Sequence, residues 1–119
     1  MHTLLFYFID EPEIINHPES FKELSPGKTV AFTVQVTGTE PMHYQWEWKP
    51  ALDGDGSEEW QPCNTERFSG TESSTLVISS VQKLNEGSYR TIISNYAGSK
   101  TSQPAKLSVG KNANTQTSW

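Results

Sequence analysis

Catalytic chemistry in this chain would have to involve Cys63, because a thiol becomes a strong nucleophile when a neighbouring base takes its proton. His17 and His43 are the side chains that could be imagined as that base. No signature of a known nucleophile surrounds Cys63, and no nearby pattern suggests an oxyanion site. A lone cysteine in a small domain is usually an inert packing or surface residue. We therefore predict no catalytic residues and no enzymatic activity.

Metal binding would have to use the loop Asp53–Glu59, which contains four carboxylates. Oxygen ligands of this kind suit calcium, but the spacing departs from the EF-hand pattern. The glycines of the loop are not followed by the Lys and Ser/Thr of a phosphate-binding loop. The histidines are dispersed, which indicates no zinc site. We interpret the loop as a solvated hairpin with no metal and no cofactor, and a calcium-dependent module is the alternative.

The length of the chain indicates the number of domains, and its charge indicates which classes of partner it could bind. A chain of 119 residues is expected to form one domain around one core. Its formal net charge is −5, and its basic residues are scattered without a Lys/Arg stripe that could neutralise phosphates. Nucleic acid is therefore excluded as an expected partner. No pattern indicates a small-molecule substrate either.

The cysteine count bears on the compartment. Cys63 is the one cysteine, so this chain cannot form an intrachain disulfide. A reducing compartment fits this most easily, which slightly favours an intracellular location. A secreted domain that lost its disulfide bridge would show the same cysteine count. An extracellular part of a membrane protein is therefore the alternative location.

The two ends differ from the middle. Residues 1–11 form an apolar leader around Leu4–Ile9 that lacks a cationic start and a small-residue cleavage site. It is too short to span a bilayer. We interpret it as a non-native or packed leader, with a truncated targeting or membrane segment as the alternative. A membrane is expected as a partner only if a parent chain has a span outside these residues. Residues 110–119 are polar and are expected to be a flexible tail or linker.

Apolar residues at every second position, with turn residues between the runs, predict several strands within residues 12–109. The clearest run is Lys28–Thr37, and Met42–Trp48, Ser74–Ser79 and Thr101–Val109 follow. Residues 87–95 also alternate, with a tyrosine near their start. The inward positions give a predicted core of Trp46, Val34, Thr91, Tyr89, Leu76 and Phe32. We predict an all-β protein, an antiparallel sandwich of two sheets.

The ordered motifs resemble the I-set of immunoglobulin-like domains. The resemblance covers residues 12–109 and rests on Gly27-x-x-Val30-x-Phe32-x-Val34-x-Val36-x-Gly38-x-x-Pro41, Tyr44-x-Trp46, Leu76-x-Ile78-x-x-Val81 and Asn85-x-Gly87-x-Tyr89-x-Thr91 with Asn95-x-x-Gly98. It implies an immunoglobulin-like sandwich whose tyrosine hydroxyl bonds to the backbone just upstream.

Three positions depart from the family pattern. Val34 and Thr91 stand where the family usually has its inter-sheet cysteines, and Asn85 stands where it usually has an acid. Bridge-free domains of this type are similar to those of intracellular muscle and cytoskeletal proteins, whereas bridged ones dominate adhesion molecules and receptors. A looser likeness to tandem modules of large multidomain proteins with signalling domains suggests a module from a longer chain.

The resemblance implies recognition rather than catalysis. In the binding hypothesis the domain contacts another protein or a neighbouring immunoglobulin-like domain through an exposed sheet face or a tip loop, and strand addition at a sheet edge is a second route. In the spacer hypothesis it only sets distance and stiffness within an array, and in the extracellular version it belongs to a receptor or adhesion ectodomain. Outward parity selects His43, Gln45, Glu47, Arg90 and Ile92 as a candidate partner face. Trp48 and Trp60 lie near strand ends, where parity does not fix the side they face; we add them as candidate interface anchors, with packing at the rim of the core as the alternative.

Overall fold

The computed structural model describes residues 9–51 and 59–110 of the chain. Within them the elements follow in the order β1 (Glu13–Asn16), β2 (Phe21–Leu24), β3 (Val30–Thr33), β4 (Gln35–Thr37), β5 (His43–Pro50), β6 (Gln61–Pro62), β7 (Thr75–Ile78), the 3₁₀ turn η1 (Lys83–Asn85), β8 (Gly87–Asn95), β9 (Gly98–Thr101) and β10 (Ala105–Val109). The predicted all-β class is confirmed.

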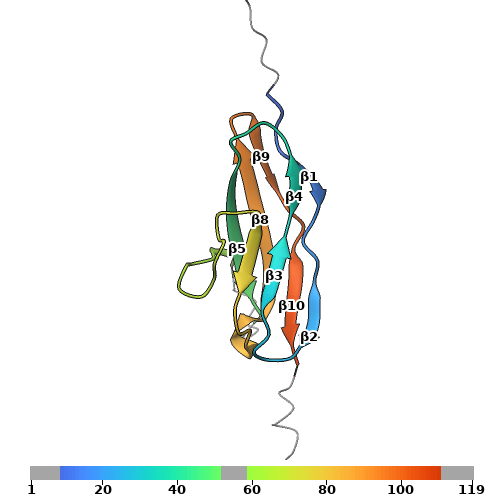
Figure 1. Ribbon diagram of the computed structural model, residues 1–119, viewed down its shortest axis with the longest axis vertical. Coiled ribbons are helices and arrows are strands. Elements are labelled where there is room, and N and C mark those ends of the chain that lie inside the picture. The colour runs from blue at the N-terminus through green and yellow to red at the C-terminus, as the bar shows by residue number, and fades with distance from the viewer. Residues whose placement is uncertain (1–8, 52–58, 111–119) are drawn as a thin grey trace, which may run out of the picture.

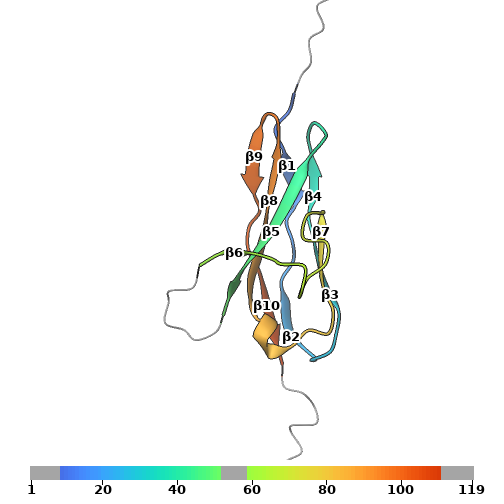
Figure 2. The ribbon, with the colours of Figure 1, turned by 90° about the vertical axis from the view of Figure 1, so that its left-hand side faces the viewer.

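The strands form two packed layers, which Figures 1 and 2 show from the front and from the side. One sheet has the order β2-β10-β8-β5-β6, with β9 also paired to β8. The other layer contains the pairs β1–β4 and β3–β7. The predicted two-sheet immunoglobulin-like sandwich is confirmed, with the core enclosed between the layers.

One strand pair runs parallel, although the prediction was antiparallel throughout. The chain leaves β1 in one layer and enters β2 in the other after a kink at His17 and Pro18, without reversing its direction (Figure 1). As a result, β2 pairs in parallel with β10. The Nδ1 atom of His17 accepts a hydrogen bond from the Gln103 N–H at 3.0 Å. This bond connects the kink to the segment between β9 and β10.

Two strands predicted as continuous are interrupted. The run Lys28–Thr37 divides into β3 and β4 at Val34, whose N–H donates to the Ser74 carbonyl at 3.0 Å. The predicted strand Thr101–Val109 divides into β9 and β10 at Ser102. There the Ser102 hydroxyl accepts the Thr91 N–H at 3.0 Å, so a side chain replaces one rung of the ladder.

The predicted inward residues are all buried in the core. Phe32, Trp46, Leu76, Tyr89 and Thr91 have no measurable exposure, and Val34 is 3% exposed. The Thr91 hydroxyl donates to the Gln45 carbonyl at 3.4 Å, so this polar group has a partner despite its burial.

The tyrosine near the start of β8 anchors the turn before it. Its hydroxyl donates to the Asn85 carbonyl at 2.5 Å, and the Asn85 side chain accepts the Gln82 N–H at 2.7 Å. Gly87 begins the strand with a φ of +152°, and a Cβ there would lie 2.3 Å from the Lys49 carbonyl oxygen. Only glycine fits that approach between β5 and β8.

Candidate interaction surface

The outer face of β5 and β8 brings together most of the predicted partner-face residues. The antiparallel register places Gln45 opposite Ile92 and Glu47 opposite Arg90, with His43 one step further along. His43 is exposed, and the other four are half-buried. Because side chains directly opposite on one face of a sheet lie close together, these residues form one continuous surface.

Trp60 joins this surface by stacking on Arg90. The Arg90 Cζ lies 4.1 Å from the centroid of the Trp60 ring. The Arg90 Nε donates to the Glu47 Oε1 at 2.9 Å, and its terminal nitrogen lies 2.9 Å from the same oxygen. The guanidinium thus stacks on the indole and donates to the carboxylate, so that a cation–π contact and a charge-assisted hydrogen bond share the same cation.

Trp48 does not belong to this surface, which corrects the sequence-based assignment. Its side chain is 7% exposed and packs in the core. The ring stacks on Tyr89 at 5.9 Å between centroids and meets the edge of Phe68 at 5.6 Å. The physical reason is that β5 continues to Pro50, so the alternation that turns Trp46 inward also turns Trp48 inward.

A hollow of about 360 Å³ adjoins the face at the start of β5. It is lined by Met42, His43, Tyr44, Gln45, Glu72, Ile92 and Ser94. Burial and the neighbouring Glu40 carboxylate raise the pKa of the Tyr44 phenol. No pattern in the sequence indicates that Glu72 lies beside this face. Glu72 belongs to an irregular segment before β7, and the alternation of apolar residues does not predict the path of such a segment.

Cys63 lies inside the fold as a packing residue. Its side chain is 5% exposed, and its N–H donates to the Trp46 carbonyl at 3.0 Å. Burial, with a smaller contribution from the Glu47 charge, raises the pKa of the thiol to about 12. Within the described part of the chain, neither His17 nor His43 is hydrogen-bonded to it.

We expect the Cys63 thiol to resist alkylation by iodoacetamide at pH 8 in the folded protein and to react readily in urea. The thiolate is the nucleophile, and burial keeps the group protonated. Because its folded pKa lies above the unfolded one, the associated stability is present below pH 9 and is lost as the pH rises toward 12. A Cys63→Ala variant should therefore show a shallower loss of stability over that window. Rapid labelling of the folded protein would contradict this placement.

The acidic loop predicted as an alternative calcium site falls largely outside the described residues. Positions 53–58 are not described, and Glu59 is exposed. Among the residues that are described, no group of three or more His, Cys, Asp or Glu side chains is arranged to hold a metal ion. In the same part of the chain, no helix has the length and apolar character needed to cross a membrane.

Comparison with known proteins agrees with this architecture. The sequence pattern of the immunoglobulin domain matches residues 11–95, and the chain belongs to the immunoglobulin-domain family. No curated protein matches it.

Among solved structures, the chain is similar to the titin M3 domain with 25% identity and a TM-score of 0.64, over 86% of this chain and 99% of that one. It is also similar to the extracellular domains 3–5 of Drosophila OTK, with 31% identity and a TM-score of 0.62 over 87% of this chain and 33% of that one. The tandem Ig repeats of Dlar share the fold at 20% identity and a TM-score of 0.65, over 82% of this chain. This chain spans 47% of the Dlar chain's length.

Proposed function

We propose that the chain is a non-catalytic protein-binding module of a larger multidomain protein, and that the outer face of β5 and β8 is its contact surface. The observation that carries the proposal is the stack of Trp60 on Arg90, held by Glu47 on a rigid sheet. Tryptophan and arginine are the residue types most enriched among the residues that dominate binding energy. Their geometry is held before a partner arrives, which lowers the entropic cost of association.

Ile92 supplies the apolar part of the same surface. It is half-buried opposite Gln45, and its outward position leaves an aliphatic side chain between the polar residues of two strands. A small apolar centre with a polar surround is the usual anatomy of a protein interface. The proposed contact therefore has Ile92 beside the Trp60–Arg90 stack, with His43 at its rim.

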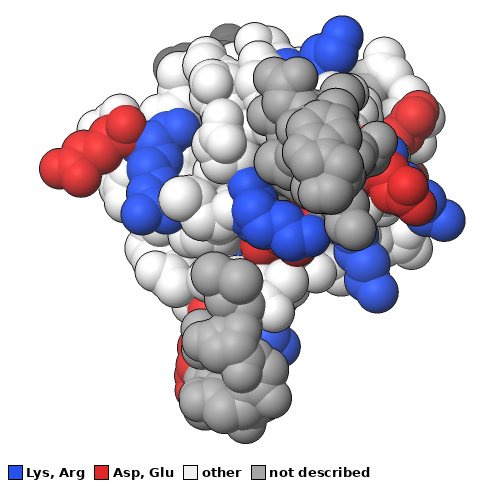
Figure 3. All heavy atoms as spheres, turned by 90° about the horizontal axis from the view of Figure 1, so that it is seen from below, with Lys and Arg blue, Asp and Glu red and all other residues white. Residues whose placement is uncertain are grey.

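The charge distribution supports a protein rather than a nucleic acid as the partner. The net charge is −5. On the end of the molecule seen in Figure 3, basic and acidic side chains are interspersed with uncharged residues. A phosphate backbone would need a continuous basic surface instead.

A spacer role is the second candidate, and the anchoring of Asp10 favours it. The Asp10 N–H donates to the Thr39 hydroxyl at 2.8 Å, and the Asp10 carbonyl accepts from the Thr39 N–H at 3.1 Å and from the Asn95 amide at 2.7 Å. The Glu11 carboxylate pairs with the Lys100 ammonium at 2.8 Å, and that hydrogen bond lowers the pKa of Glu11. The described chain therefore enters the domain in a fixed direction and leaves at the opposite end (Figure 1).

The face is tested with Ile92→Arg combined with Trp60→Ala, using Ala31→Arg as the control. Ala31 is exposed on β3, in the other layer, so its variant adds the same charge away from the face. Wild-type and variant domains are immobilised, and bound proteins from the source cells are quantified by mass spectrometry. We expect a specific set of proteins to be reduced by about tenfold or more in the face variant, because hot-spot losses exceed 1.4 kcal/mol.

Two outcomes would count against the face. If both variants retain the same proteins as the wild type, then the face is not the contact surface. If the wild type enriches no protein over a blank support, the spacer role is favoured. Matching melting temperatures of the variants show that any loss of binding does not come from unfolding.

A further inference from the structure

The outer edge of β5 is already used as a pairing edge by the rest of the chain. Trp48 pairs with Gln61 of β6. One alternation further, the Trp46 carbonyl accepts the Cys63 N–H at 3.0 Å, and the Trp46 N–H donates to the Thr71 carbonyl at 3.0 Å. Residues 61–71 thus provide hydrogen-bond partners for the backbone of this edge as far as Trp46.

The next position along the edge is open. Tyr44 stands opposite Ile93 of β8, two residues from the Trp46–Thr91 pair. Because backbone groups alternate in direction along a strand, the Tyr44 N–H and carbonyl point to the same outer side as those of Trp46. Within residues 9–51 and 59–110, no hydrogen bond engages either group. Such an edge can accept a strand from another chain.

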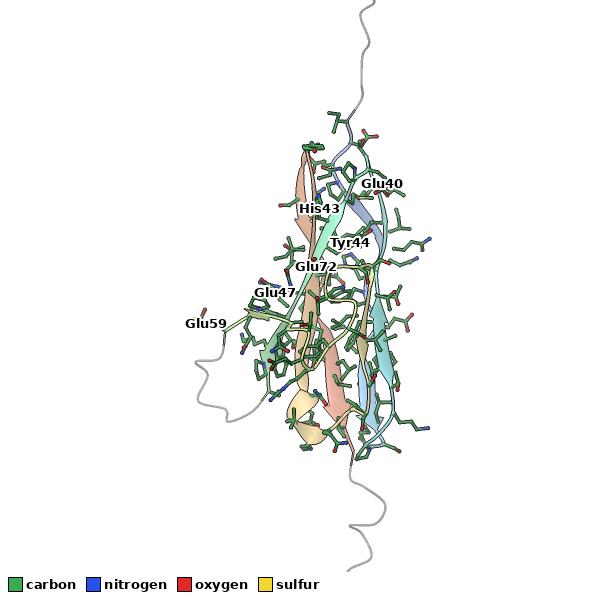
Figure 4. All side chains as sticks on the ribbon, turned by 60° about the vertical axis from the view of Figure 1, so that its left-hand side comes forward. Glu40, His43, Tyr44, Glu47, Glu59 and Glu72 are labelled. Atoms are coloured by element: carbon green, nitrogen blue, oxygen red, sulfur yellow. The ribbon has the colours of Figure 1, made fainter. Side chains whose placement is uncertain are left out.

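The surroundings of this edge are acidic. The hollow beside Tyr44 is lined by the Glu72 carboxylate and by no lysine or arginine. Figure 4 shows Glu40 and Glu72 on either side of Tyr44, with Glu47 and Glu59 further along the same side of the molecule. Glu47 is neutralised by Arg90, whereas Glu72 is exposed and has no ion-pair partner in the described part of the chain. The free charge next to the open edge is therefore negative.

We propose that the Tyr44 edge of β5 binds an extended, lysine- or arginine-bearing segment of a partner protein. The segment pairs with the backbone of Tyr44 and places a basic side chain against Glu72. This inference rests on the proposed protein-binding function and assigns it a second contact, at the sheet edge beside the outer face. Main-chain hydrogen bonds supply affinity in this mode of recognition, and the side chain in the hollow supplies selectivity.

A second copy of the chain is a poorer occupant of the same edge. Two copies meeting edge to edge would bring the Glu40 and Glu72 carboxylates of one copy toward those of the other. Like charges directly opposite are destabilising, and each chain carries a net charge of −5. A basic segment removes this repulsion, so charge complementarity selects a different protein.

The probe is an acetylated and amidated peptide in which lysine alternates with valine, titrated into the isotopically labelled 119-residue chain. A peptide with glutamate in place of lysine is the control ligand. We expect the lysine peptide to shift the Tyr44 amide resonance and slow its hydrogen exchange. Glu72→Lys should weaken that binding by about tenfold or more, because a charge-assisted contact is lost and a repulsive one is added. Glu19→Lys, an equal change at an exposed site before β2, should leave it unchanged.

Several results would overturn the inference. The edge is closed if the Tyr44 amide of the free protein is as protected as that of Trp46. Charge selection is wrong if the glutamate peptide binds equally well or if both lysine variants lose binding equally. A Tyr44 resonance that shifts with protein concentration alone identifies a second copy as the occupant. Because Ile92 also lines the hollow beside Tyr44, the single variant Trp60→Ala, whose residue lies outside that hollow, separates the two proposals. Loss of partners from Trp60→Ala with no response at Tyr44 leaves the proposed function intact.

Discussion

Trp46→Ala is expected to lower the free energy of unfolding by about 3–5 kcal/mol, the usual cost of removing a buried aromatic side chain. The Trp46 ring has no measurable exposure and lies 6.5 Å from Phe32, centroid to centroid. Its indole Nε1–H donates to the Ser73 carbonyl at 2.7 Å. The substitution opens a cavity between the layers and leaves that carbonyl without its indole donor, so packing and hydrogen bonding are lost together.

The matched control is Trp60→Ala, which deletes the same side chain from the outer face. There the main loss is the contact with the Arg90 guanidinium, and an exposed cation–π pair contributes about 0.5–1 kcal/mol. Urea unfolding followed by circular dichroism compares the two variants without relying on tryptophan fluorescence. Equal destabilisation would show that Trp46 is not the centre of the core.

The core was predictable because alternation is a property of the strand itself. Within their own strands, the buried residues Val30, Phe32, Leu76 and Tyr89 fall at alternate positions. Alternate side chains of a strand point to the same face of the sheet. The same parity placed Glu47 and Arg90 outward and opposite one another. It could not show that Trp60 folds back onto Arg90, since that contact depends on where the loop after β5 returns.

The strand interruptions were not predictable from local pattern. Val34 and Ser102 both lie in runs that alternate well, and each interruption depends on a partner distant in sequence. Ser102 replaces a backbone rung with its hydroxyl, and no propensity distinguishes that serine from its neighbours. Tertiary hydrogen bonding decided these boundaries.

Phe68 and Glu72 were missed for a related reason. Phe68 is 3% exposed and packs against Trp48, but it lies in a segment that forms only an isolated bridge, Ser69 with Val77. Glu72 comes next to the β5 edge because Thr71 before it bonds to Trp46. The positions of both residues depend on the path of the irregular segment between β6 and β7 past the edge of the sheet. The alternation of apolar and polar residues predicts strands and not such a path.

The second large effect is expected from Val34→Cys combined with Thr91→Cys. Both residues are buried, and the family resemblance predicts that they correspond to the cysteines of the inter-sheet bridge. Closing a loop of this length should stabilise the fold by about 4 kcal/mol in the chain-entropy account. Losing the hydrogen bond from the Thr91 hydroxyl to the Gln45 carbonyl costs about 1 kcal/mol. The net gain should be about 3 kcal/mol in the oxidised protein, a balance of those two terms.

Urea midpoints of the double variant with and without reductant measure this gain, because only the oxidised form carries the bridge. The reduced form should be slightly less stable than the wild type, since it has lost the Thr91 hydroxyl and the Val34 side chain without compensation. A register control pairs Val34→Cys with Ile93→Cys, which moves the second thiol one inward step along β8. Because disulfide geometry tolerates little displacement, this control should oxidise poorly. If it forms the bridge more readily than the Thr91 variant, then Val34 faces Ile93, and the correspondence with the bridged domains is wrong by one inward position.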